Sequence, residues 1–149
     1  MRYAFTMIEL IFVIVILGIL AAVAIPKLSA TRNDALIASM SQSIATAAME
    51  IATYAVANGE IEDDLSTMSN AIEMLVVRND AVLDVPNRAV DLRMGTVPDC
   101  ITIQVISAGT DENLTVLYGA GGDNLCDSLH DVFDLRAYPL TLKGATVVH

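Results

Sequence analysis

The apolar residues are distributed unevenly along the chain, and one segment near the N-terminus is an almost unbroken apolar run. The run covers residues 5–25, FTMIELIFVIVILGILAAVAI, and only Thr6, Glu9 and Gly18 fall outside the hydrophobic set. As a helix with a rise of about 1.5 Å per residue it would extend roughly 30 Å, the thickness of a bilayer core. The pattern therefore predicts a membrane-spanning helix over residues 5–26.

A cleaved secretory signal peptide is the competing explanation of this run. The segment Ala21-Ala22-Val23-Ala24 could serve as a small-residue cleavage site. However, the apolar region of a signal peptide usually spans only about 7–15 residues, and here the helical pattern continues past the small residues without a break. The pattern favours a membrane anchor.

The pattern over residues 28–58 predicts that the helix continues as an amphipathic helix. Apolar residues recur at steps of three and four, opposite a polar stripe of the same period. Asn58-Gly59 suits the helix end, because Gly tolerates the left-handed conformation found there. With the anchor this makes one long helix, interrupted only at Pro26. The apolar positions are Ile37, Met40, Ile44, Ala47, Ala48, Ile51 and Ala55.

The rest of the chain predicts short elements of both kinds. Alternating apolar residues indicate strands, and clusters of turn formers such as the segment SAGTDEN at residues 107–113 indicate a hairpin loop. We expect an α+β fold, with a small antiparallel sheet packed on the C-terminal half of the long helix. The expected elements are a helix over 65–77 with Asp64 or Ser69 as N-cap, an irregular stretch over 78–87, strands over 90–94, 101–105 and 114–118, a helix capped by Asp123, and a final strand that runs through 140–142 and 146–148.

Composition narrows the class of protein. The 149 residues are 54% hydrophobic and 17% charged, which is typical of a folded domain. A net charge of −10 repels phosphate backbones, and no Lys/Arg cluster offsets it, so we expect no nucleic-acid partner. Neither His130 nor His149 has a Ser or Cys nucleophile at a readable spacing. We therefore expect no enzymatic activity and no cofactor.

Glu9 is the residue that does not suit an apolar helix. An acidic side chain at the centre of a membrane helix costs about 2.5–3.5 kcal/mol, and such residues are by default functional candidates. The alternative is structural: Glu9 lies near one end of the run, where its carboxylate could extend to the membrane interface.

The residues around Glu9 resemble the start of type IV prepilins and type II secretion pseudopilins. The resemblance rests on Ala4-Phe5-Thr6-Met7-Ile8-Glu9-Leu10 and on the apolar run that continues to Pro26-Lys27. The match consists of a small residue followed by Phe-Thr, a Glu at the fifth position counted from Phe, and an uninterrupted apolar helix after it. It covers roughly residues 1–35, whereas the remainder agrees with the family only in general layout.

The resemblance implies a specific sequence of processing and assembly. Residues 1–4 would be a cytoplasmic leader, removed between Ala4 and Phe5 by a prepilin peptidase that also N-methylates Phe5. The single-pass subunit would wait in the inner membrane with its head, residues 27–149, outside the cytoplasm. Inner-membrane assembly machinery would then draw it into an extracellular or periplasmic filament. The family usually has Gly before the cut, where this chain has Ala4, and the leader here is short.

Two further expectations concern the filament core. Glu9 would pair with the Phe5 amine of a neighbouring subunit and set the register between copies. The helix should be weakest between Gly18 and Pro26, because Pro cannot donate to the carbonyl of Ala22 and Gly lowers helix propensity. The corresponding stretch loses helicity in related filaments, whereas in an isolated membrane subunit it should be more nearly continuous.

The resemblance thus implies a structural subunit of a type IV pilus-like filament, whose main partners are copies of itself. One alternative is a pseudopilin of a type II secretion system, which shares the same N-terminal region. A second alternative from a different class is a single-pass, membrane-anchored binding module that never polymerises.

Cys100 and Cys126 fit neither a C-x-x-C redox motif nor a zinc site, which needs more ligands. A head outside the cytoplasm lies in an oxidising compartment, so we predict a disulfide between them. Two buried free thiols are the alternative if the head stays cytoplasmic. Disulfide-closed C-terminal regions are also common among type IV pilins.

A row of aspartates in the last predicted helix has two interpretations. Asp123, Asp127, Asp131 and Asp134 recur at steps of four, four and three. The simpler interpretation is a solvated helix face with Asp123 as N-cap. The other is a Ca²⁺ site built on Asp123, Asp127 and Asp131, because Ca²⁺ takes six or more oxygen ligands. Major pseudopilins carry calcium near their C-terminus.

Asn113 begins the triplet Asn113-Leu114-Thr115, a glycosylation sequon, on the predicted hairpin. Asp111, two places earlier, also resembles the acidic residue of the extended sequon in bacterial N-glycosylation systems. Asn113 is therefore a candidate glycosylation site.

Overall fold

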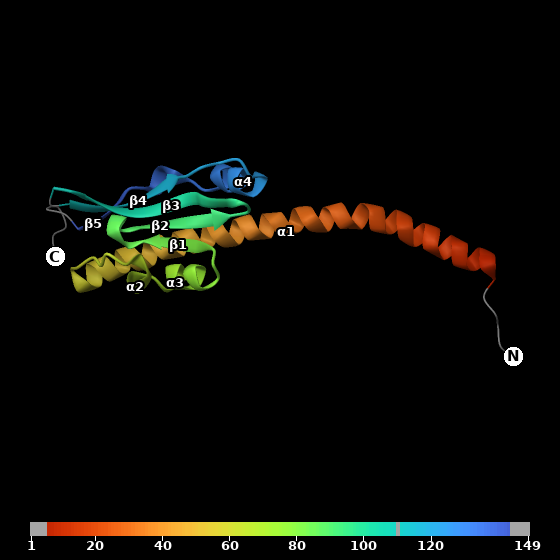
Figure 1. The fold of residues 1–149 in the computed structure, drawn as a ribbon, viewed down its shortest axis with the longest axis horizontal. Helices are drawn as coiled ribbons and strands as arrows, with labels where there is room; N and C mark the ends of the chain where they lie inside the picture. Colours follow the sequence, from red (N-terminus) through yellow and green to blue (C-terminus); the bar gives the residue numbers. More distant parts are fainter. Residues whose placement is uncertain (1–5, 110, 144–149) are drawn as a thin grey trace. The chain divides into compact units, whose positions relative to one another are not determined.

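The computed structural model describes residues 6–109 and 111–143 and has the expected α+β fold (Figure 1). A long helix near the N-terminus, α1, is followed by short helices and a five-stranded antiparallel sheet. The chain divides after Leu36 into two compact units, the second beginning at Ile37, and α1 contributes residues to both.

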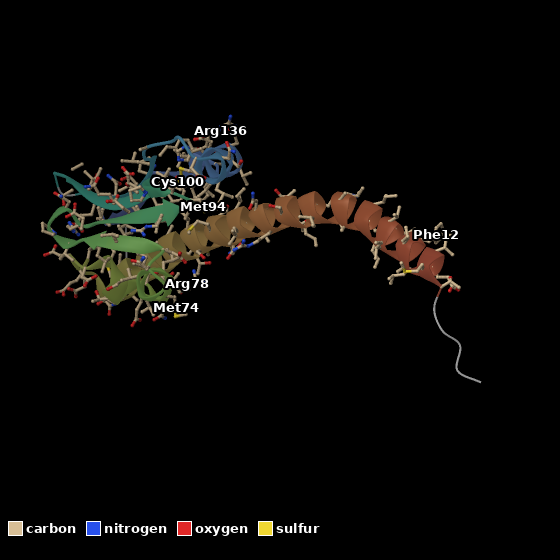
Figure 2. All side chains as sticks on the ribbon, turned by 45° about the vertical axis from the view of Figure 1, so that its right-hand side comes forward. Phe12, Met74, Arg78, Met94, Cys100 and Arg136 are labelled. Carbon is tan, nitrogen blue, oxygen red and sulfur yellow. A yellow bond between two sulfur atoms is a disulfide. The ribbon has the colours of Figure 1, made fainter. Side chains whose placement is uncertain are left out.

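The helix α1 spans Met7–Asn58. Within the described residues it is the one helix long and apolar enough to cross a membrane. Between Met7 and Leu28 its large apolar side chains, such as Phe12, are 41–79% exposed (Figure 2). A helix that is apolar all round is stable only where lipid or other protein covers it.

The backbone of α1 remains helical through Pro26. The interruption predicted at this residue therefore does not end the helix in the isolated chain. The missing N–H of one Pro removes one backbone bond, whereas the bonds of the neighbouring turns remain. The loss of helicity expected inside a filament stays a prediction. At the other end, Gly59 follows the helix with a φ of +70°, as predicted for its C-terminal cap.

The second unit is organised around the sheet, whose strands lie in the order β1-β2-β3-β4-β5. Each strand pairs antiparallel with its neighbour in the sequence. Alternate residues of the central strands are buried, as the alternation in the sequence predicts. The strands are β1 (Ala81–Asp84), β2 (Ala89–Met94), β3 (Val97–Ala108), β4 (Asp111–Tyr118) and β5 (Leu140–Lys143).

The C-terminal half of α1 belongs to the same core as the sheet. All seven apolar positions predicted from the period of three and four are buried there, from Met40 at 8% exposure to Ile44, Ala47 and Ile51 at 0%. The strand residues that join this core include Val90, Leu92, Ile101, Ile103, Val105, Leu114 and Val116.

The helix predicted over residues 65–77 is two helices, α2 (Leu65–Met68) and α3 (Asn70–Val77). Ser69, between them, has an extended backbone with φ −143° and ψ 118°. Both predicted N-caps are in use, because Asp64 accepts a hydrogen bond from Ser66 N and Ser69 accepts one from Ile72 N. The split lets a second cap satisfy the N–H groups at the start of α3.

Glu50 of α1 completes the start of α3. Its Oε2 accepts hydrogen bonds from the Ser69 hydroxyl at 2.7 Å and from the backbone N–H of Ala71 at 3.0 Å. Ser69 is only 2% exposed, so its hydroxyl depends on this acceptor. Glu50 therefore holds α2 and α3 against α1.

Replacing Glu50 with Ala is expected to lower the free energy of unfolding by about 1.5–3 kcal/mol, the usual range for a hydrogen bond to a charged group. Glu50→Gln keeps an acceptor oxygen and should lose less. The measurement is urea unfolding of the full chain in detergent micelles. Glu60→Ala, at an exposed acidic position, is the matched control, and equal losses in both Ala variants would contradict this role of Glu50.

Two further details differ from the sequence prediction, and a third stays untested. The stretch over residues 78–87 is not irregular, because β1 and the 3-10 helix η1 (Val85–Asn87) occupy it. The hairpin loop is shorter than SAGTDEN, because β3 extends to Ala108 and β4 begins at Asp111. The residues 146–148 lie outside the described range.

The last helix, α4 (Asn124–Val132), begins at the predicted cap Asp123. Asp134 is not on this helix, contrary to the predicted continuous face. It instead caps the 3-10 helix η2 (Leu135–Ala137), where its carboxylate accepts from Arg136 N. The helix α4 ends earlier because the backbone at Phe133 is extended, with φ −83° and ψ 120°.

Candidate functional site

The N-terminal turn of α1 holds Glu9 in a capping box. The Glu9 carboxylate accepts hydrogen bonds from the Thr6 backbone N–H at 2.9 Å and from the Thr6 hydroxyl at 2.7 Å. In return, the Thr6 hydroxyl oxygen accepts from Glu9 N at 3.4 Å. This reciprocal pattern satisfies N–H groups that a helix start leaves free. Glu9 thus has a local role that the Thr-x-x-Glu spacing could have revealed.

The other residues predicted to act in assembly are described only in part. Ala4 and Phe5 lie outside the described residues, so cleavage between them and pairing of the Phe5 amine with Glu9 stay predictions. Gly18 lies in the exposed part of α1, and apart from the adjacent backbone of the helix itself and the two neighbouring residues, no heavy atom lies within 4 Å of the place where a Cβ would stand. The structure therefore places Glu9 and Gly18 on one apolar helix.

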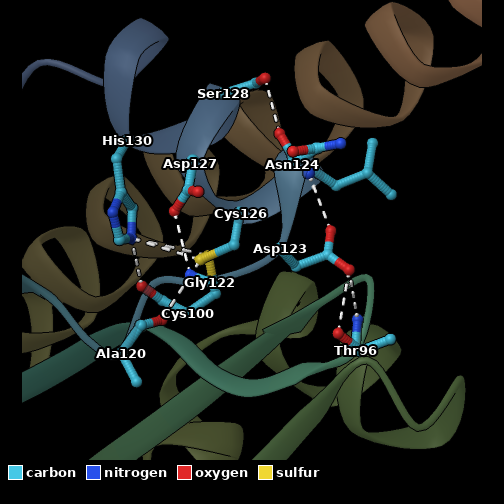
Figure 3. The surroundings of a disulfide bond; sticks show 11 residues. Thr96, Cys100, Ala120, Gly122, Asp123, Asn124, Cys126, Asp127, Ser128 and His130 are labelled. Atoms are coloured by element: carbon cyan, nitrogen blue, oxygen red, sulfur yellow. Dashed lines mark hydrogen bonds between the residues drawn. A yellow bond between two sulfur atoms is a disulfide. The ribbon is translucent and has the colours of Figure 1, made fainter.

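The predicted disulfide between Cys100 and Cys126 is confirmed (Figure 3). Cys100 is in β3 and Cys126 is in α4, with their Cα atoms 5.7 Å apart. Both residues are 0% exposed. The bond joins the last helix covalently to the centre of the sheet.

His130 lies beside this disulfide, which the sequence analysis did not anticipate. Its Nε2 is 3.5 Å from Cys126 Sγ and 3.6 Å from Cys100 Sγ, and it donates a hydrogen bond to the Cys100 carbonyl at 2.7 Å. Cys126 and His130 are four residues apart and therefore share one face of α4. That spacing is the signal from which the contact could have been found.

Tyr118 of β4 positions the histidine from the other side. The two rings are stacked with their centroids 4.4 Å apart. The Tyr118 hydroxyl lies 2.9 Å from the carbonyl of His130 and 2.6 Å from that of Phe133, at the end of α4. Helix carbonyls at this end lack partners within the helix, so Tyr118 both orients His130 and closes α4.

Two of the aspartates at α4, Asp123 and Asp127, accept hydrogen bonds. Asp123 accepts from Leu125 N at 2.8 Å and from the hydroxyl and N–H of Thr96, at 2.9 and 3.3 Å (Figure 3). The bonds from Leu125 and Thr96 hold the pKa of Asp123 below its ordinary value, because they stabilise the carboxylate. Asp127 accepts from Gly122 N at 3.2 Å.

The structure does not bring the predicted calcium ligands together. Among the described residues, one group of three metal-capable side chains has its ligand atoms within 4.8 Å of one another, and it is Cys100, Cys126 and His130. Asp123, Asp127 and Asp131 form no such group in that part of the chain. Instead, Asp123 caps the helix and joins it to the turn between β2 and β3.

Asn113 lies within β4 and not in a hairpin loop. Its partners in the sheet are Ile106 of β3 and Thr141 of β5, and its side chain is half-buried. Its neighbour Leu114 is buried in the core, so Asn113 faces the opposite side of the sheet. Glycosylation of Asn113 stays a prediction, and a glycan there would project from the face of the sheet.

Comparisons with protein-family models, with curated proteins and with solved structures found no match. The function is therefore inferred from this chain's own residues. The part of α1 from Met7 to Leu28 offers a continuous apolar surface with one carboxylate in its first turn, which suits binding to lipid or to other helices.

Proposed function

We propose that this protein is a structural subunit of a type IV pilus-like filament, assembled through its N-terminal helix. The observation that supports this most directly is the first part of α1, where every large apolar side chain from Met7 to Leu28 is exposed and Glu9 is the one acidic residue. Lipid can cover this surface before assembly, and copies of the same helix can cover it afterwards.

The carboxylate gives such packing a preferred register. An uncompensated charge inside a helical filament core would be costly, so Glu9 requires a cation from a neighbouring copy. After removal of residues 1–4 that cation is the Phe5 amine, which remains positive when singly methylated. The Cys100–Cys126 disulfide supports a head outside the cytoplasm, because disulfides persist in oxidising compartments.

The experiment is electron microscopy of filaments sheared from the cell surface, with mass spectrometry of their subunit. Long surface fibres containing this chain support a pilin. Fibres that form only on overexpression support a pseudopilin of a type II secretion system. The absence of filaments under every condition would leave the non-polymerising anchored binding module.

The same sample tests processing. The purified subunit is expected to begin at an N-methylated Phe5, without residues 1–4, as the prepilin-like segment implies. Intact mass and N-terminal sequencing measure this directly. A mature chain that starts at Met1 would contradict leader removal, and one that starts after Ala24 would identify a cleaved signal peptide instead.

A further inference from the structure

We propose that reduction of the Cys100–Cys126 disulfide creates a binding site for a tetrahedral divalent cation of the Zn²⁺ class. Its protein ligands would be the two cysteine thiolates and Nε2 of His130. These three residues belong to β3 and α4 of the second unit. The inference therefore does not depend on the proposed filament function.

The position of the histidine carries the proposal. In a tetrahedral site with Zn–S bonds of about 2.3 Å and Zn–N bonds of about 2.0–2.1 Å, a ligand nitrogen and a ligand sulfur lie roughly 3.5–3.6 Å apart. Nε2 of His130 already lies 3.5 Å from Cys126 Sγ and 3.6 Å from Cys100 Sγ. Both nitrogen–sulfur distances thus match a zinc site before any ion is present.

To bind the ion, the two sulfurs must separate from a covalent bond to about 3.8 Å, the sulfur–sulfur distance implied by the same Zn–S bonds. The Cα atoms are 5.7 Å apart, so rotation about the Cα–Cβ bonds can supply this movement. His130 must also move its Nε2 proton to Nδ1 and turn Nε2 away from the Cys100 carbonyl oxygen, now 2.7 Å away. This ends that hydrogen bond and directs the Nε2 lone pair to the metal.

The chemistry balances with a phosphine reductant. The phosphine takes up oxygen from water and becomes a phosphine oxide, while the disulfide gains two electrons and two protons and becomes two thiols. The cation then displaces both thiol protons and binds two thiolates and one neutral imidazole. Three protein ligands leave the fourth tetrahedral position to water.

The surroundings suit a bound ion. The stacked ring of Tyr118 supports one face of the imidazole, as neighbouring contacts do around metal-ligating histidines. Tyr118, His130 and residues 131–136 line a hollow of about 470 Å³, which opens a route from solvent to the half-buried histidine. The disulfide and the bound cation exclude each other, yet either one would link β3 to α4.

The experiment titrates Co²⁺, a spectroscopic substitute for Zn²⁺, into the full chain in detergent micelles. After reduction and removal of the phosphine, we expect one equivalent of Co²⁺ to produce tetrahedral d–d bands and a thiolate charge-transfer band. The oxidised protein should show neither. Addition of Zn²⁺ should remove the bands by displacing Co²⁺.

Two variants of the two histidines separate this site from unspecific thiol binding. His130→Ala should weaken Co²⁺ binding by at least about 10-fold, the lower end of the loss seen when even a supporting contact of a ligand is removed. His149→Ala, the matched control, should bind normally. The proposal would be overturned if the reduced protein showed no tetrahedral bands, or if the bands were equally strong in both variants.

Circular dichroism covers the case in which the reduced chain loses its fold. Metal binding to a native site then stabilises the folded state, so Zn²⁺ should restore the near-ultraviolet signal of the reduced wild type. The His130→Ala variant should not recover it. Recovery in that variant, or a reduced wild type that stays unfolded with excess Zn²⁺, would refute the site.

Discussion

Glu9→Ala is expected to leave a stable, correctly cleaved, membrane-inserted subunit that forms no filaments. In the proposed filament the substitution would leave the Phe5 amine of each neighbouring copy buried without a partner. Breaking a buried ion pair in this way costs about 3–5 kcal/mol, which corresponds to a loss of at least about 100-fold in the affinity of each added subunit. The measurement is filament yield from cells that lack the wild-type chain.

The capping box makes this test sharper, because Glu9 also supports the start of α1. Glu9→Gln keeps the shape and the capping ability of the side chain but removes its charge. If the charge sets the register, Glu9→Gln should be nearly as defective as Glu9→Ala. If the cap is what matters, Glu9→Gln should assemble normally.

Two controls complete the comparison. Thr6→Ala removes the other half of the capping box and keeps the carboxylate, so it should retain most of the filament yield. Asp34→Ala removes an exposed acidic residue from the same helix, beyond the apolar run, and should assemble like the wild type. Normal filament yield from Glu9→Ala would show that the carboxylate has no role in assembly.

The second large effect concerns the disulfide. The double variant Cys100→Ala, Cys126→Ala is expected to lower the free energy of unfolding by about 2–4 kcal/mol, the range for closing a loop of this size. The bond spans 26 residues and joins the sheet to α4, so its loss frees the segment between them in the unfolded chain. Urea unfolding of the full chain in detergent micelles measures the difference.

The reduced wild type supplies the matched control. Without metal it should unfold at nearly the same urea concentration as the double variant, because both lack the covalent link. With Zn²⁺ the reduced wild type should gain stability, whereas the double variant should not. A double variant as stable as the oxidised protein would show that other contacts suffice to hold α4 on the sheet.

Features of the fold that depend on local order could be predicted from the sequence. The apolar stripe of α1 follows the helical period, so every predicted position from Ile37 to Ala55 is buried. The caps Asp64, Ser69 and Asp123 act on N–H groups two or three residues away, so their function follows from neighbouring residues. The alternation of β2, β3 and β4 likewise marks their buried face.

Features that join distant segments could not be predicted in the same way. Glu50 contacts residues 19 and 21 positions later, and that contact accompanies the break at Ser69 that divides one predicted helix into two. The extent of β3 and β4 depends on cross-strand pairing, which places Asn113 in a strand although it ends a segment rich in turn formers, residues 107–113. Such contacts depend on register and packing, which periodicity does not encode.

The same distinction between local and long-range contacts applies to the candidate sites. The apolar helix near the N-terminus, the exceptional position of Glu9 and the presence of two cysteines could be predicted from the sequence, because these are properties of composition and local spacing. Only the tertiary structure brought His130 of α4 against Cys100 of β3, 30 residues earlier. The physical reason is that the two residues meet through the packing of a helix on a sheet, and neither segment alone specifies where the other will lie.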